Sequence, residues 1–182
     1  MKNKLLLHTC CAPCLIGTKL AMDKNKDKDN IGEFETSCFW FNPNIHLYTE
    51  YKSRLTALVD YSSANNISLI VEDKYGLVEF VDNVVGDLDN RCVYCYETRV
   101  RETARYAKDH GFDMFSTTLL VSPYQNHDKI KEICEKYSKE SGVGFFYSDF
   151  RADFRAGQKS ARENNIYTQK YCGCIFSEYK RT

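Results

Sequence analysis

Short apolar segments alternate with amphipathic ones along this chain, and that alternation is what most restricts its fold. The expected strands cover residues 4–8, 34–45, 67–73, 112–120 and 143–150. The expected helices between them cover residues 14–22, 47–66, 77–85, 91–111 and 125–142. Strands that alternate with helices favour a mostly parallel α/β sheet with right-handed crossovers. We therefore expect a mostly parallel sheet flanked by helices, with a helical C-terminal segment.

The length of 182 residues favours one domain over residues 1–182. The polar stretch at 23–33 is expected to be a loop. No apolar stretch approaches the roughly 20 residues that a membrane helix needs. The opening "MKNKLLLHTCC" has too short an apolar run for a signal peptide. These features predict a cytoplasmic protein without a membrane partner.

Nine cysteines in a reducing compartment point to metal binding or redox chemistry more than to structural disulfides. Seven of them form three groups: Cys10, Cys11 and Cys14; Cys92 and Cys95; Cys172 and Cys174. The first group follows the first expected strand and begins a helix, which is where parallel sheets bind ligands. The three groups can meet only through the fold, at the carboxyl edge of the sheet. The two single cysteines, Cys38 and Cys134, are expected to be core residues.

The number of grouped sulfurs bears on which metal they bind. A structural zinc site usually takes four ligands from two nearby pairs, whereas the two C-x-x-C elements here, 11–14 and 92–95, lie far apart in the sequence. Seven thiols suit an iron–sulfur cluster, and the surplus suits either a second metal or a working dithiol. Cys172 and Cys174, separated only by Gly173, fit both of the latter roles.

The charge of the chain is zero overall but unevenly distributed. Residues 151–182 contain seven Lys or Arg against three Asp or Glu. This basic segment is either a contact for an anionic partner or an ordinary solvated surface. Basic residues also stand near tyrosines in the motifs, a combination that can stack a nucleobase and hold its phosphates. The candidates for this role are Arg99, Tyr124, Arg151 and Arg155.

Five motifs together resemble the epoxyqueuosine reductase family QueH. They are "HTCCAPC", "RCVYCYETR", "STTLLVSPYQ", "DFR" and "YTQKYCGC", in this order between residues 5 and 177. The resemblance implies a cobalamin-independent reductase that removes the epoxide oxygen of epoxyqueuosine at the wobble position of tRNA. It also implies a [4Fe-4S] cluster, a second iron nearby and a Rossmann-like sheet of the nucleotide α-hydrolase type.

The resemblance further implies roles for particular residues. The expected cluster ligands are Cys10, Cys11, Cys92 and Cys95, with Cys14 as a further candidate. Cys172 and Cys174 are then second-metal ligands or a redox-active pair, and the 151–182 segment completes the metal site. The expected partners are tRNA, through its anticodon loop, and an unidentified electron donor. Tyr124, Tyr171 and Asp153 are unranked candidates for the proton donor.

Two other functions fit part of the same pattern. A non-catalytic metal-binding module that binds RNA would also need basic residues and cysteines, but seven grouped sulfurs exceed the needs of one structural metal. A tRNA sulfur-transfer enzyme also combines such a sheet with cysteines. That alternative is disfavoured because a glycine-serine phosphate loop is missing after the first strand.

Overall fold

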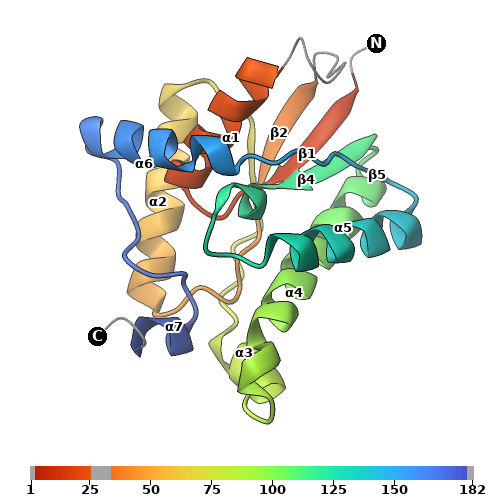
Figure 1. Cartoon of the computed structure of the whole chain (residues 1–182), viewed down its shortest axis with the longest axis vertical. Coiled ribbons are helices and arrows are strands. Elements are labelled where there is room, and N and C mark those ends of the chain that lie inside the picture. Colours follow the sequence, from red (N-terminus) through yellow and green to blue (C-terminus); the bar gives the residue numbers. More distant parts are fainter. Residues whose placement is uncertain (1–2, 26–33, 180–182) are drawn as a thin grey trace.

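The computed structural model describes residues 3–25 and 34–179 (Figure 1). These residues form a five-stranded sheet with the order β3-β2-β1-β4-β5, and every pairing in it is parallel. The strands are β1 (Lys4–His8), β2 (Glu35–Trp40), β3 (Leu69–Val71), β4 (Met114–Thr117) and β5 (Gly144–Phe145). The predicted Rossmann-like sheet is therefore confirmed, and β1 lies at its centre.

Helices connect and cover the strands. They are α1 (Ala12–Asn25), α2 (Tyr48–Ala64), α3 (Leu77–Val84), α4 (Arg91–Asp109), α5 (His127–Ser141), α6 (Phe154–Glu163) and α7 (Ile175–Tyr179). Three short 3-10 helices cover Leu88–Asn90, Thr118–Val121 and Arg151–Asp153. None of the helices within the described ranges is both long and apolar enough to cross a membrane. The predicted helical C-terminal segment is present as α6 and α7.

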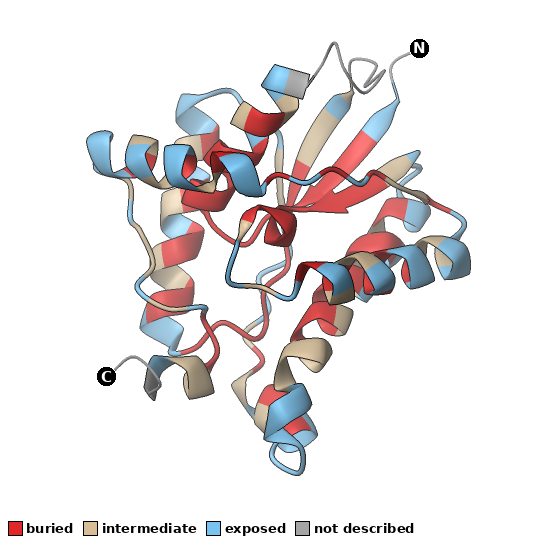
Figure 2. Cartoon of the chain, viewed as in Figure 1, coloured by how far each residue is buried: buried red, intermediate tan, exposed pale blue. Residues whose placement is uncertain are grey.

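The two faces of the sheet carry different helices. From the central strand β1, the chain adds β2 and then β3 on one side of the sheet, and later β4 and then β5 on the other side. Right-handed crossovers therefore put α1 and α2 on one face of the sheet and α5 on the other face. The alternating side chains of strand β2 support this arrangement. Cys38 and Trp40 pack in the apolar cluster with α2, whereas Phe39 packs in the cluster with α4 and α5. The buried residues accordingly concentrate along the central strands (Figure 2).

Helix α6 lies directly against α1 (Figure 1). The approach is so close that a Cβ atom at Gly157 of α6 would lie 2.6 Å from the backbone nitrogen of Gly17 and 2.7 Å from the carbonyl oxygen of Pro13. Only glycine fits at this crossing. The first helix, which begins at the cysteine turn, thus fixes the position of the basic C-terminal helix.

Several elements differ in length from the sequence prediction. Strand β2 ends at Trp40 because the Asn42–Ile45 turn follows, and β4 ends at Thr117 because the Thr117 hydroxyl accepts a hydrogen bond from Leu119 N and starts a 3-10 helix. Strand β5 pairs over only two residues at the sheet edge. Part of the expected 23–33 loop is helical, since α1 runs to Asn25, and residues 26–33 lie outside the described residues.

Candidate metal centre and substrate cavity

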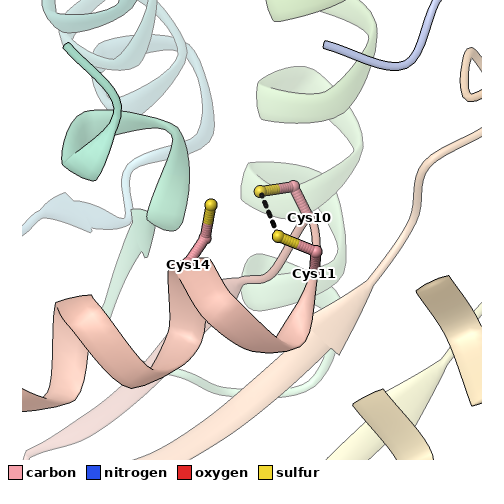
Figure 3. Close-up of side chains that lie close together, drawn as sticks. All are labelled: Cys10, Cys11 and Cys14. Atoms are coloured by element: carbon pink, nitrogen blue, oxygen red, sulfur yellow. Dashed lines mark hydrogen bonds between the residues drawn. The ribbon is translucent and has the colours of Figure 1, made fainter. Parts of the chain in front are cut away.

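Three cysteine sulfurs converge in the turn between β1 and α1. The sulfurs of Cys10, Cys11 and Cys14 all lie within 4.8 Å of one another, and all three residues are buried. Figure 3 shows the three side chains on the same strand-to-helix turn, with the hydrogen bond of 3.9 Å between the sulfurs of Cys10 and Cys11. Cys14, the further candidate of the sequence prediction, is therefore a full member of this group, which we call the sulfur triad.

The end of the neighbouring strand holds the triad in place. Thr118, just after β4, accepts a hydrogen bond of 3.1 Å from the backbone N–H of Cys10 and donates its own proton to the Cys10 sulfur at 3.4 Å. Gln169, in the C-terminal segment, donates to the Cys14 sulfur at 4.0 Å. The triad is thus fixed from two further parts of the chain.

The triad can carry negative charge at one sulfur. Hydrogen bonds from the Cys11 and Cys14 thiols, and from Thr118, hold the pKa of Cys10 well below its usual range. Burial raises the pKa of Cys11, and hydrogen bonds to Cys10 and Cys11 raise that of Cys14. Soft sulfur donors at this spacing fit a thiophilic metal, which binds thiolates in place of protons.

The other four grouped cysteines come from two further elements. Cys92 and Cys95 lie one turn apart in α4, and Cys172 and Cys174 lie just before α7. Burial raises the pKa of Cys95 to about 12, and the neighbouring thiols of Cys172, Cys174 and Cys92 act in the same direction. These four thiols are thus near enough to influence one another electrostatically, but among the described residues only the triad has three sulfurs within 4.8 Å of one another.

Arg54 of α2 holds the segment that carries Cys172 and Cys174. Its guanidinium donates to the carbonyl oxygens of Tyr171 at 2.9 Å and Cys172 at 3.0 Å. Its Nε donates to a carboxylate oxygen of Glu50 at 2.6 Å, and Arg54 is only 2% exposed. A buried fork of donors thus ties α2 to the backbone beside both cysteines.

The turn between these two cysteines is possible only with glycine. Gly173 has φ +133°, and a Cβ there would lie 3.2 Å from an Arg54 nitrogen and 3.3 Å from Ile45. The Gly173 carbonyl accepts a hydrogen bond of 2.7 Å from His46 N, and the Tyr171 hydroxyl donates to the His46 carbonyl. The loop after β2 therefore holds the segment that carries Cys172 and Cys174 through two hydrogen bonds of the His46 backbone.

A cavity of about 1010 Å³ opens over both cysteine groups. Its wall includes Cys10, Cys14, Cys92, Cys172 and Cys174. The same wall contains cationic side chains from α2, α4, α6 and the C-terminal segment: Arg54, Arg91, Arg99, Arg155, Lys159, Arg162 and Lys170. Among the described residues, no Asp or Glu lines this cavity. The wall thus favours an anionic ligand whose reacting part reaches the sulfurs.

Three of the four predicted substrate-binding residues line this cavity. Arg99 is buried, and its Nε donates to Asn44 at 2.7 Å, which directs the guanidinium. Tyr124 is 84% exposed at the wall, and Arg155 lies nearby on α6. Arg151 is not among the lining residues, and its guanidinium forms a two-point ion pair with Asp149.

The three candidate proton donors occupy different places. Tyr124 and Tyr171 line the cavity, and the Tyr171 hydroxyl is engaged by the His46 carbonyl. Asp153 is buried away from the lining residues and forms an ion pair with Lys24. Of these groups, Tyr124 presents the most exposed phenol to the cavity.

Sequence reasoning did not single out Arg54, Thr118 or Gln125. Thr118 and Gln125 lie inside the quoted motif "STTLLVSPYQ", so the motif was the available signal. The sequence signal for Arg54 was weaker, since an arginine four residues after a glutamate normally indicates an exposed helical ion pair. Cys38 and Cys134, in contrast, are fully buried in the apolar core as predicted.

Comparison with known proteins places the chain among its relatives. A family profile described as epoxyqueuosine reductase QueH matches residues 5–180. The epoxyqueuosine reductase QueH of Dehalococcoides mccartyi is 38% identical over 181 residues, covering 100% of this chain and 96% of the relative. That of Thermotoga maritima is 33% identical over 192 residues, covering 97% and 91%. The U34-tRNA thiolase NcsA of Methanococcus maripaludis, solved with its [4Fe-4S] cluster, is similar in fold with a TM-score of 0.58 and 14% identity; the match covers 97% of this chain and 62% of the thiolase.

Proposed function

Because the chain belongs to the epoxyqueuosine reductase QueH family, we propose that it reduces epoxyqueuosine to queuosine at the wobble position of tRNA. The observation that carries this proposal is a basic cavity whose wall contains five of the seven grouped cysteines. Such a cavity combines phosphate recognition with soft metal ligands. It spans residues from the first strand tip to the segment before α7, in agreement with one functional unit over the chain.

The sulfur donors fit a [4Fe-4S] cluster. Cys10, Cys11, Cys92 and Cys95 remain the proposed ligands, and the position of Cys14 within the triad makes it a further proposed ligand. Cys172 and Cys174 are proposed as ligands of a second iron or as a redox-active pair, with the basic C-terminal segment completing the site. When bound, an iron–sulfur cluster supplies electrons one at a time, and a neighbouring iron supplies a Lewis acid.

The residues of the chain bind and orient the RNA. A flipped-out wobble nucleotide needs its phosphates held and its base stacked, because it has left the anticodon loop stack. Arg155, Lys159 and Arg162 face the cavity from α6 and are proposed to hold phosphates. Tyr124 offers an exposed ring for stacking, held edge-on by Phe154 with ring centres 5.7 Å apart.

The reaction consumes two electrons and two protons for each epoxide. Both C–O bonds of the epoxide break, a carbon–carbon double bond forms, and the oxygen leaves as water. The electrons come from a one-electron donor that remains to be identified. One of the protons is proposed to come from a phenol at the cavity wall, of which Tyr124 is the most accessible. A reducing cytoplasm, the predicted location, keeps the thiols available for metal.

The direct test is a single-turnover assay. Protein reconstituted with iron and sulfide under anaerobic conditions, then reduced with dithionite, is incubated with tRNA that carries epoxyqueuosine. Mass spectrometry of the nucleosides should show loss of one oxygen atom. Intact cluster with RNA binding but no oxygen loss would support a non-catalytic module instead, and sulfur incorporation would support a transferase.

Two matched cysteine variants test the site assignment. Cys11 and Cys38 are both 1% exposed, so replacing either removes a similarly buried thiol. Cys11→Ala should lose cluster iron and the reductase activity, whereas Cys38→Ala should retain both. Equal iron loss in the two variants would show that iron retention depends on core packing and not on the triad.

A further inference from the structure

The exposed sulfur of the C-terminal group has a defined hydrogen-bond donor. Cys172 is exposed at the cavity wall, and the side-chain nitrogen of Gln125 lies 3.3 Å from its sulfur. Gln125 follows the 3-10 helix Thr118–Val121, so the donor to the sulfur comes from a different part of the chain than Arg54. The sulfur is thus approached by an N–H donor, and its own backbone carbonyl is held separately.

The neighbouring hydrogen bonds fix which end of the Gln125 amide faces the sulfur. The backbone N–H of Asn126, which can only donate, lies 3.3 Å from the Tyr96 hydroxyl oxygen. The single proton of Tyr96 is therefore free to be donated to Gln125 Oε1, at 2.7 Å. With its oxygen engaged by Tyr96, the amide of Gln125 must present its NH₂ group to Cys172.

The two residues that orient Gln125, Tyr96 and Asn126, are both held at helices. Tyr96 belongs to α4 and is 3% exposed, so its ring has little freedom. Asn126 caps α5, where its side chain accepts the N–H of Lys129 at 3.1 Å. The donor to Cys172 is consequently preorganised before any ligand enters the cavity.

We propose that Gln125 is a positioning residue that directs an N–H bond at the Cys172 sulfur, and that Tyr96 sets its orientation. The inference rests on the proposed function for the chemical role of Cys172. An N–H donor stabilises a thiolate relative to a thiol. At a sulfur bound to iron, it also favours the reduced state of the metal centre. Either way, Gln125 makes Cys172 better suited to hold negative charge.

The test uses reconstituted holoprotein and three variants in this chain of hydrogen bonds. They are Gln125→Leu, Gln125→Glu and Tyr96→Phe. Gln158→Glu is the matched control, because Gln158 is also half-buried in the wall of the same cavity and the substitution adds the same charge. Circular dichroism and thermal melting identify the variants that fold as the wild type does. If a Gln125 variant does not fold, Tyr96→Phe still tests the proposal.

The readout is the reduction midpoint potential of the reconstituted centre, followed by absorption spectroscopy during stepwise reduction with dithionite. Loss of the N–H donor should lower this potential in Gln125→Leu, lower it further in Gln125→Glu, where a carboxylate faces the sulfur, and lower it least in Tyr96→Phe.

Two results would overturn the inference. One is an unchanged potential in all three variants, and the other is an equal change of the potential in Gln158→Glu. If the three variants show the expected changes but the wild-type protein leaves epoxyqueuosine unreduced, the proposed function is contradicted and the role of Gln125 stands.

Discussion

At the scale of single residues, Arg54 shows how a buried charge can organise a site. Its guanidinium has one carboxylate partner, Glu50, and two backbone carbonyl partners beside Cys172. Glu50 in turn accepts the hydroxyl of Tyr167 at 2.5 Å. Each polar group in this set is paired, so the ion pair can be buried without leaving an uncompensated charge.

Removing Arg54 should therefore be costly. Arg54→Met leaves the Glu50 carboxylate buried with one partner fewer and two carbonyls without their donor. We expect a loss of about 3–5 kcal/mol in the free energy of unfolding, measured by urea denaturation.

Arg105 provides the control, because it pairs with Glu102 and Asp109 but is 56% exposed. Arg105→Met should cost no more than about 1 kcal/mol. Similar losses in the two variants would mean that burial of the Arg54 ion pair has no special energetic role.

The residue scale also shows which parts of the site a sequence can reveal. The grouped cysteines and the motif around Thr118 were visible because unusual residue types recur at close spacing. Arg54 was not, because two of its three partners are backbone carbonyls more than a hundred residues away, and a carbonyl carries no sequence signature. Arg151 was predicted to bind the substrate as part of the motif "DFR" and of the basic segment, and the sequence did not reveal the ion pair of its side chain with Asp149.

At the scale of elements, the contact between α1 and α6 connects the cysteine turn to the basic helix. Gly157 and Gly17 let the two backbones approach each other, and on the other face of α6 the side chains of Arg155, Lys159 and Arg162 line the cavity. The glycine contact therefore determines where those three cations stand.

Gly157→Ala should displace α6 from α1. The new Cβ would clash with backbone atoms of Gly17 and Pro13, which cannot move as a side chain can. We expect destabilisation of about 1–3 kcal/mol, measured by thermal and chemical denaturation, together with weaker binding of an anticodon stem-loop in a filter-binding assay. Gly86→Ala is the control, since a Cβ there meets nothing within 4 Å. Unchanged RNA binding in a folded Gly157→Ala protein would contradict the link between the helix contact and the cations.

Elements were more predictable in kind and order than in length. The alternation of strands and helices predicted the parallel sheet, because apolar periodicity reflects which face is buried. Strand ends depended on interactions outside that pattern. The hydroxyl of Thr117, for example, ends β4 by capping a 3-10 helix, although the apolar run continues through Leu120.

At the scale of the whole molecule, zero net charge conceals a strong local asymmetry. The cavity wall contains seven Lys or Arg side chains and no Asp or Glu among the described residues. A nucleic acid responds to that local field more than to the total charge. The overall charge of a sequence is thus a poor guide to an RNA-binding surface of this kind.

The salt dependence of RNA binding tests this distribution. Each cation that contacts a phosphate contributes about 0.7–0.9 to the slope of log affinity against log salt concentration. Replacing Arg155 or Arg162 with Gln should reduce the slope by about that amount, measured with an anticodon stem-loop between 50 and 200 mM salt. Arg151→Gln should leave the slope unchanged, because Arg151 is paired with Asp149 outside the cavity wall. A reduced slope in Arg151→Gln equal to the others would assign the contact to the whole basic segment.

The distance along the chain between the triad and its cover has a consequence for how the protein is made. Cys10, Cys11 and Cys14 leave the ribosome early, whereas α6 and the segment around Gln169 and Cys172, which close over them, leave it late. Because chains begin to fold during synthesis, the sulfur triad is for a time without the segment that covers it in the folded protein.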